Sequence, residues 1–262
     1  MAIHLHHERA GSGPPLLYIG GTGGDLRSKP NVLDGPLVAH VDVLAYDQRG
    51  QGRSDKPDEP YSMAQYADDA ADLLASTGWS RAGVMGVSFG GMVAQELAIR
   101  HPGLVDRLVL ACTSSGGAGG ASYPLHELES LPADERFAAH LALSDVRRDA
   151  SWQAAHPDEV AQLRAFADAQ AAVGADDPDL AVGRRRQLEA RSTHDTTARL
   201  GQISSPTFVC AGRHDGIAPV TNSEVLLERI PDATLQVFEG GHLFLLQDRA
   251  AWPAIIEFLT AS

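Results

Sequence analysis

Short runs of apolar residues, separated by turn residues and helical patterns, recur along most of the chain. The first run, 3–8, alternates weakly between apolar and polar side chains, which is typical of an edge strand. The later runs are almost wholly apolar, as in the strands of a parallel sheet that helices cover on both faces. The pattern predicts strands at 3–8, 16–19, 41–46, 82–87, 108–111, 207–211 and 234–238.

Helical spacing of apolar residues fills most of the intervals between these strands. In 63–76, for example, Met63, Tyr66, Ala70 and Leu73 fall on one side of a helix. The alternation of strands with helices indicates an α/β fold. The helices are expected at 63–76, directly after Ser88, and at about 133–143, 158–173, 178–199, 221–230 and 248–260.

A glycine-rich stretch, 115–122, interrupts this alternation. From about 124 to 200 the sequence shows helical segments and no strand pattern, and the strands resume at Thr207. We therefore expect a discontinuous α/β core formed by 1–115 and 201–262, with an inserted helical cap at 116–200.

Composition and charge limit the class of protein. The 262 residues include 21 Lys+Arg and 34 Asp+Glu, and the net charge of −13 argues against nucleic acid or an anionic membrane surface as a partner. The two cysteines, Cys112 and Cys210, exclude a disulfide scaffold, fit a reducing compartment and are expected to be buried. The sequence has no apolar run of membrane-spanning or signal-peptide length, so we expect a cytoplasmic protein.

The segment Gly86-Val87-Ser88-Phe89-Gly90-Gly91 carries the most specific chemical signal. An apolar strand precedes it and a helix follows it, which is the context in which Gly-x-Ser-x-Gly forms a nucleophile elbow. The turn is so tight that a Cβ at position 86 or 90 would meet neighbouring backbone. It also places the serine at a helix N-terminus, where negative charge is favoured. Ser88 is therefore the candidate nucleophile, and helix capping is the alternative role.

A serine nucleophile needs a histidine base and an acid that orients it. Among eleven histidines, His242 alone lies in a glycine-flanked loop after the last strand, at the sheet edge where open parallel sheets place their chemistry. Asp215 directly follows strand 207–211, whereas the strand ending near Ala111 is followed by no carboxylate. We assign His242 as the base and Asp215 as the acid. Asp47 precedes Ser88 in the chain, and its neighbours favour a role as a turn scaffold.

An oxyanion hole needs two N–H groups that point at one position. The residue after the nucleophile, Phe89, supplies one candidate. The loop after strand 16–19, Gly20-Gly21-Thr22-Gly23-Gly24, supplies the other, and we assign it to Thr22. A plain flexible turn is the alternative. The loop lacks the Gly-x-Gly-x-x-Gly spacing of a dinucleotide site.

The inserted cap is expected to set specificity. We expect Gly21, Tyr123, Trp152 and Phe166 to contact the substrate, with Phe137 as a further apolar candidate and helix packing within the cap as the alternative. Arg184, Arg185 and Arg186 could bind a substrate carboxylate, but a solvated charged helix face explains the run more simply.

Five segments together resemble the α/β-hydrolase superfamily in its compact, capped form. They are Gly20–Gly23, Tyr46–Ser54, Gly86–Gly91, Gly212–Pro219 and Gly241-His242. The resemblance implies a mostly parallel sheet of seven or eight strands with the first antiparallel, helices on both faces, and a triad of Ser88, Asp215 and His242. Many members of the superfamily have His-Gly where this chain has Gly20-Gly21; this departure leaves the backbone role intact and leaves open which hydrogen bonds fix the loop.

Within the superfamily the chain is similar to 3-oxoadipate enol-lactonases, small carboxylesterases and cofactor-free bromoperoxidase or perhydrolase proteins. The resemblance implies hydrolysis of a small carboxylic ester or lactone through an acyl-serine, with no metal or organic cofactor. Perhydrolase or haloperoxidase-like activity, carbon–carbon bond hydrolysis and a non-catalytic ligand-binding role remain open at this stage, as does a homo-oligomer.

Overall fold

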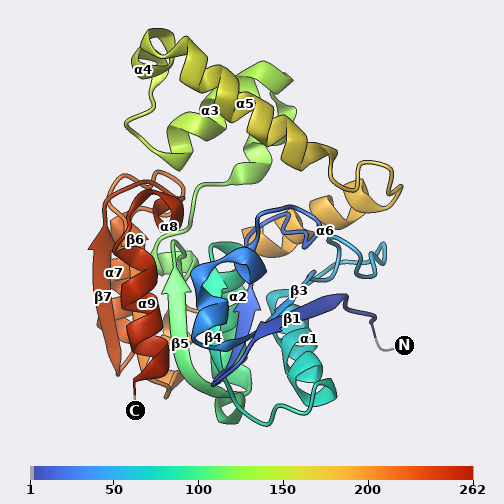
Figure 1. The fold of residues 1–262 in the computed structure, drawn as a ribbon, viewed down its shortest axis with the longest axis vertical. Helices are drawn as coiled ribbons and strands as arrows, with labels where there is room; N and C mark the ends of the chain where they lie inside the picture. The colour runs from blue at the N-terminus through green and yellow to red at the C-terminus, as the bar shows by residue number, and fades with distance from the viewer. Residues whose placement is uncertain (1–2, 262) are drawn as a thin grey trace.

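A single twisted sheet forms the centre of the fold in the computed structural model, which describes residues 3–261 (Figure 1). Its seven strands lie in the order β1-β3-β2-β4-β5-β6-β7. β1 is antiparallel to β3, and all other neighbours are parallel, which confirms the predicted sheet. The strands are β1 (His7–Gly11), β2 (Pro15–Ile19), β3 (Asp42–Tyr46), β4 (Ala82–Val87), β5 (Val105–Ala111), β6 (Thr207–Gly212) and β7 (Ala233–Phe238).

The first strand lies further along the chain than predicted. The expected strand at 3–8 is wrong in position, because β1 runs from His7 to Gly11. The residues before it hydrogen-bond to the loop after β3: the His6 N–H donates to Ser54 Oγ, and the Asp47 N–H donates to the His6 carbonyl. A weak alternation of apolar side chains cannot distinguish pairing with a strand from pairing with a loop.

Apolar cores lie on both faces of the sheet, which confirms that helices cover both faces. On one face, α1 (Met63–Ser76), α2 (Phe89–Arg100) and α7 (Val220–Arg229) pack on strand residues such as Leu17 and Val84. On the other, α8 (Phe244–Gln247), α9 (Ala251–Thr260) and the 3-10 turn Pro36–Ala39 pack on Leu16 and Met85. Because successive strand residues point to opposite faces, neighbouring apolar residues belong to different cores.

The helical insertion lies between β5 and β6, above the carboxyl ends of the strands, with α6 nearest the sheet (Figure 1). It contains α3 (Ala133–Ser144), α4 (Ala150–Ala155), α5 (Pro157–Ala172), α6 (Leu180–Ser192) and 3-10 turns at Gly117–Gly119, Leu125–Ser130 and Thr197–Gln202. Gly116 and Asp195 form an isolated antiparallel bridge, which brings the two ends of the insertion together. The boundaries 115/116 and 200/201 stay predictions.

Two features of the insertion differ from the expected helices. The helix predicted over 178–199 ends at Ser192. Beyond it, the hydroxyl groups of Thr196 and Thr197 donate to Gln95 Oε1 and to the Gly116 carbonyl, and such bonds compete with helical ones. The short helix α4 was not predicted. No helix within 3–261 is long and apolar enough to span a bilayer.

Helix α6 packs directly on the loop after β3 through two glycines. A Cβ on Gly183 would lie 1.9 Å from the Gly50 carbonyl oxygen. In turn, a Cβ on Gly50 would lie 3.0 Å from the Gly183 carbonyl oxygen. Gly50 also has φ +80°, a conformation that favours glycine. An ion pair between Lys56 and Asp177 at 2.8 Å joins the same loop to the segment before α6. The close backbone contact therefore fixes how α6 lies on the core.

Replacement of Gly183 with alanine is expected to destabilise the protein by roughly 1–2 kcal/mol, because overpacking against backbone, about 2–3 kcal/mol, exceeds the gain of about 1 kcal/mol in helix propensity. Urea unfolding at equilibrium measures the change. Gly103→Ala is the matched control, since a Cβ there would meet no atom within 4 Å. A Gly183→Ala protein as stable as wild type would contradict the packing described.

Candidate active site

The turn between β4 and α2 holds Ser88 in a strained conformation. Its φ of 54° and ψ of −115° lie in a region that non-glycine residues rarely adopt. The Ser88 N–H donates to the Ala111 carbonyl at 2.8 Å, and Thr113 Oγ1 donates to the Ser88 carbonyl at 2.8 Å. These contacts from the end of β5 hold the strained turn in place. Ser88 is partly exposed to solvent.

The glycines of the elbow are required by close backbone contacts. A Cβ on Gly86 would lie 2.3 Å from the Gly90 carbonyl oxygen, and a Cβ on Gly90 would lie 2.0 Å from the Ile19 carbonyl oxygen. Neither neighbour is a side chain that could move aside. The turn can therefore form in this sequence because glycine occupies both positions.

Ser88, His242 and Asp215 lie in a continuous hydrogen-bonded row. His242 Nε2 is 3.0 Å from Ser88 Oγ, and His242 Nδ1 is 2.7 Å from Asp215 Oδ2. The Asp215 side chain is fully buried, and its Oδ1 accepts the N–H groups of Ile217 and Ala218 at 2.7 and 2.9 Å. A carboxylate beside Nδ1 favours the tautomer with the proton on Nδ1, which leaves Nε2 free to accept the serine proton. The geometry suits acyl transfer; the catalytic roles of the three residues stay predictions.

The C-terminal end of α3 is hydrogen-bonded to the loops that carry His242 and Asp215. The His242 N–H donates to the Ser144 carbonyl at 2.6 Å, and the Gly216 N–H donates to the Leu143 carbonyl at 2.9 Å. A Cβ on Gly241 would lie 2.0 Å from the Ser144 oxygen, so glycine is also needed beside His242. The cap thus positions part of the candidate site. Sequence reasoning missed this contact, because no local pattern marks residues 143–144.

The glycine-rich loop after β2 lies against the candidate nucleophile. A Cβ on Gly21 would be 3.6 Å from Ser88 Cβ, so this loop approaches the serine closely. Within residues 3–261 the backbone N–H groups of Thr22 and Phe89 have no hydrogen-bond partner. Both are therefore available to an oxyanion, although the roles assigned to them stay predictions.

Two glutamines fix the glycine-rich loop after β2. Gln48 Nε2 donates to the Gly20 carbonyl at 2.9 Å from the loop after β3. Gln187, a buried residue of α6, accepts the Gly23 N–H at 2.9 Å. The sequence analysis identified neither residue. One core residue and one cap residue therefore hold this loop in place.

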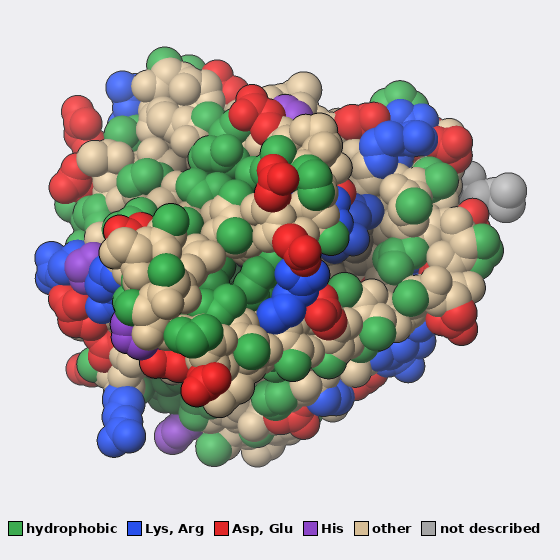
Figure 2. All heavy atoms as spheres, turned by 90° about the horizontal axis from the view of Figure 1, so that it is seen from above, with side chains coloured by type: hydrophobic (Ala, Val, Ile, Leu, Met, Phe, Trp, Pro, Cys, Tyr) green, Lys and Arg blue, Asp and Glu red, His purple; other side chains and the backbone are tan. Residues whose placement is uncertain are grey.

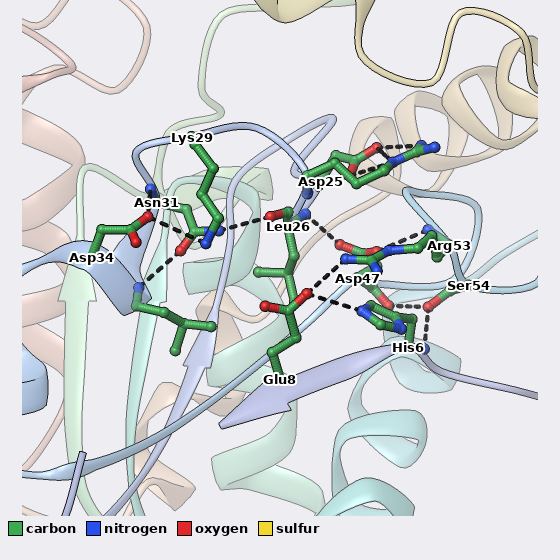
Figure 3. A network of polar contacts seen from close by, with 12 residues as sticks. His6, Glu8, Asp25, Leu26, Lys29, Asn31, Asp34, Asp47, Arg53 and Ser54 are labelled. Atoms are coloured by element: carbon green, nitrogen blue, oxygen red, sulfur yellow. Dashed lines mark hydrogen bonds and ion pairs between the residues drawn. The ribbon is translucent and has the colours of Figure 1, made fainter. Parts of the chain in front are cut away.

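Asp47 supports the far end of the same loop. Its carboxylate accepts the N–H groups of Leu26 and Arg53 at 2.7 and 2.8 Å, and Ser54 Oγ donates to its carbonyl (Figure 3). A Cβ on Gly52 would lie 2.2 Å from the same carboxylate. Asp47 therefore acts as the turn scaffold that the sequence predicted, and it connects the loop after β3 with the glycine-rich loop after β2.

The predicted substrate contacts lie in different surroundings. Gly21 lies beside Ser88. The Tyr123 N–H donates to the Ile217 carbonyl, in the loop that carries Asp215. The Trp152 ring stacks on His156 with centroids 4.5 Å apart, and the guanidinium of Arg164 lies over the Phe137 ring. Phe166 is 57% exposed, so no pocket encloses it. Their contacts with substrate stay predictions.

The arginine run faces the surface, as its simpler interpretation expects. Arg185 and Arg186 both pair with Asp58, and Arg186 also pairs with Glu189 at 2.9 Å. Arg184 is exposed and lines a groove of about 580 Å³ between α6 and the turn at 125–130. Seen from above the insertion, apolar side chains alternate with acidic and basic ones on the surface (Figure 2).

The two cysteines are buried, as expected. Burial raises the pKa of the Cys112 thiol well above its usual value, and the nearby Asp215 carboxylate raises it further. Burial likewise raises the pKa of Cys210. Neither thiol is therefore ionised near neutral pH, and neither can replace Ser88 as a nucleophile.

Comparisons with known proteins agree with this architecture. The family model described as alpha/beta hydrolase fold matches residues 14–162. The chain is 32% identical to RutD of Variovorax paradoxus (strain S110), provisionally named a carbamate hydrolase, over 99% of this chain and 96% of that one. It is 29% identical to a poly(3-hydroxyalkanoate) depolymerase of Ectopseudomonas oleovorans, over 94% and 84%.

A solved enol-lactonase from Burkholderia xenovorans LB400 superposes with a TM-score of 0.78 over 98% of this chain and 97% of that one. The identity is 23%, so this likeness shows the shared fold alone. The resemblance inferred from the sequence is confirmed.

Proposed function

The chain belongs to the α/β-hydrolase fold family, and from this premise we propose that it is a serine hydrolase that cleaves a small carboxylic ester or lactone. The observation that carries the proposal is the hydrogen-bonded row Asp215–His242–Ser88 at the carboxyl ends of the strands. The name carbamate hydrolase, borne by a similar protein, also denotes attack on a carbonyl carbon bonded to a heteroatom.

The proposed reaction has two steps. Ser88 Oγ attacks the carbonyl carbon while His242 Nε2 takes the hydroxyl proton, and Asp215 stabilises the resulting imidazolium. The N–H groups of Thr22 and Phe89 bind the oxyanion of the tetrahedral intermediate. His242 then returns the proton to the leaving oxygen, and an acyl-serine forms. Water, deprotonated by His242, attacks the acyl-serine and releases the acid and free Ser88.

Covalent labelling tests the proposal directly. Incubation with a fluorophosphonate should phosphonylate Ser88 and abolish hydrolysis of p-nitrophenyl valerate, because the reagent reacts with an activated serine. Peptide mass spectrometry locates the modification. The control is Ser114→Ala, which removes a buried neighbouring hydroxyl and should be labelled like wild type.

Hydrolysis of the ester without labelling of Ser88 would contradict the mechanism. Absence of both hydrolysis and labelling would instead favour a ligand-binding protein on this fold.

A further inference from the structure

Arg191, near the end of α6, is a buried cation with no acidic partner. The residue is 6% exposed, and within residues 3–261 no carboxylate lies within 4.0 Å of its guanidinium. Nη1 donates to the Tyr123 carbonyl at 2.9 Å and Nη2 donates to Ser122 Oγ at 2.8 Å. Nε has no partner. An unpaired buried charge is costly, so its presence here calls for an explanation.

The guanidinium remains charged in spite of its burial. Burial lowers the pKa of Arg191 to about 10, which is still well above neutral pH. The positive charge is therefore permanent under ordinary conditions, and an anion that reached it would gain a charge-assisted hydrogen bond.

The face of α6 that carries Arg191 contacts segments on two sides of the candidate active site. Gln187, one helical turn earlier and on the same face, accepts a hydrogen bond from Gly23 in the glycine-rich loop after β2. Arg191 donates to the Tyr123 carbonyl, and the Tyr123 N–H donates to the Ile217 carbonyl in the loop after β6 that carries Asp215. Because β4 and β5 lie between β2 and β6, the two loops that this face contacts flank the strand end that carries Ser88.

Gln187 supplies a second donor without an acceptor. Its side chain is fully buried, its Oε1 is taken by the Gly23 N–H, and its Nε2 has no partner. Two buried donors thus lie one turn apart on one helix face. A carboxylate has two oxygens and about four acceptor positions, so one such group could accept from both.

We propose that Arg191 and Gln187 recognise a carboxylate on the substrate, so that the enzyme acts on anionic esters or lactones such as the half-esters of dicarboxylic acids. The inference rests on the proposed function and names its substrate class. The negative overall charge does not oppose it, because the Arg191 charge is local and shielded from solvent. Arg185 and Arg186 are engaged with Asp58 and Glu189, and Arg184 is exposed, so these arginines do not supply this site.

Two esters of equal acyl length test the inference. The mono-p-nitrophenyl ester of glutaric acid carries a carboxylate, and p-nitrophenyl valerate carries a methyl group in its place. Wild type should have the higher kcat/KM for the half-ester. Arg191→Gln should lower the ratio of the two kcat/KM values by roughly 10- to 100-fold, the range of a charged hydrogen bond, mainly through KM.

Variants of the same helix separate recognition from structure. Arg191→Lys keeps the charge and should retain part of the preference, whereas Arg184→Gln removes a charge from the exposed face and should leave the ratio unchanged. An equal loss for both esters in Arg191→Gln would show a structural role and overturn the inference. A wild-type enzyme with no preference for the half-ester would overturn it as well.

A binding measurement keeps the inference independent of turnover. The Ser88→Ala protein is titrated calorimetrically with monomethyl glutarate and with methyl valerate, with and without Arg191→Gln. The inference requires tighter binding of the half-ester, and loss of this difference in the double variant. Failure of hydrolysis with this binding pattern intact would contradict the proposed function alone; equal binding of both esters would contradict the inference alone.

Discussion

Replacement of Ser88 with alanine is expected to lower kcat for p-nitrophenyl valerate hydrolysis by roughly 10⁴-fold or more, as for other enzymes that lose a serine nucleophile. The reason is that His242 then has no hydroxyl to activate, and the acyl-serine cannot form. The remaining N–H groups of Thr22 and Phe89 can still polarise a bound carbonyl, so a small residual rate above water is expected. Stopped assays at high enzyme concentration measure it.

The fold of this variant should be unaffected. Alanine has a Cβ, as serine does, so the strain at φ 54° is already present in the wild type. The thermal unfolding midpoint is the control, and it should stay close to that of wild type. A Ser88→Ala enzyme with a rate within tenfold of wild type would show that another group is the nucleophile.

Replacement of Asp215 with asparagine is expected to lower kcat by roughly 10³- to 10⁴-fold, an effect known for triads with an altered acid. Asp215 Oδ1 accepts two backbone N–H groups, so the amide oxygen of asparagine must take that position. Its NH₂ group then points at His242 Nδ1 and donates to it. The imidazole must carry its proton on Nε2, which faces Ser88 and can no longer accept the hydroxyl proton.

The pre-steady-state rate of p-nitrophenol release measures this effect on acylation. Asp232→Asn is the matched control, because Asp232 is exposed in the turn before β7 and the same change there should leave the rate unaltered. Retention of more than a tenth of the wild-type rate by Asp215→Asn would mean that the carboxylate does not orient the base.

The parts of the molecule that could be predicted are those whose causes are local. Buried parallel strands are apolar throughout, so six of the seven positions followed from short apolar runs. The elbow followed from Gly86 and Gly90, because the contacts that require glycine lie within a few residues or on the adjacent strand. The positions of His242 and Asp215 followed from the rule that parallel strands end at one edge of the sheet.

The contacts between cap and core could not be predicted in this way. Gln187 and Arg191 are polar residues of a helix, and their burial depends on which face of α6 packs on the core. The arginine run at 184–186 lies mostly on the outer face of α6, whereas Arg191, the other arginine of this helix, is buried. One clue was present: Gly183, Gln187 and Arg191 recur every fourth residue, and a small residue in such a row marks a close approach.

The hydrogen bond from Gly23 to Gln187 has a consequence for chimeric enzymes. A crossover at Gly116 and Asp195 exchanges the whole insertion and removes the Gln187 acceptor that holds the glycine-rich loop after β2, together with the Ser144 carbonyl that accepts the His242 N–H. Such a chimera would lose the two contacts that position this loop and His242. Crossovers on either side of α4 and α5 keep both contacts, so this helical pair is the part of the cap that can be exchanged as a module.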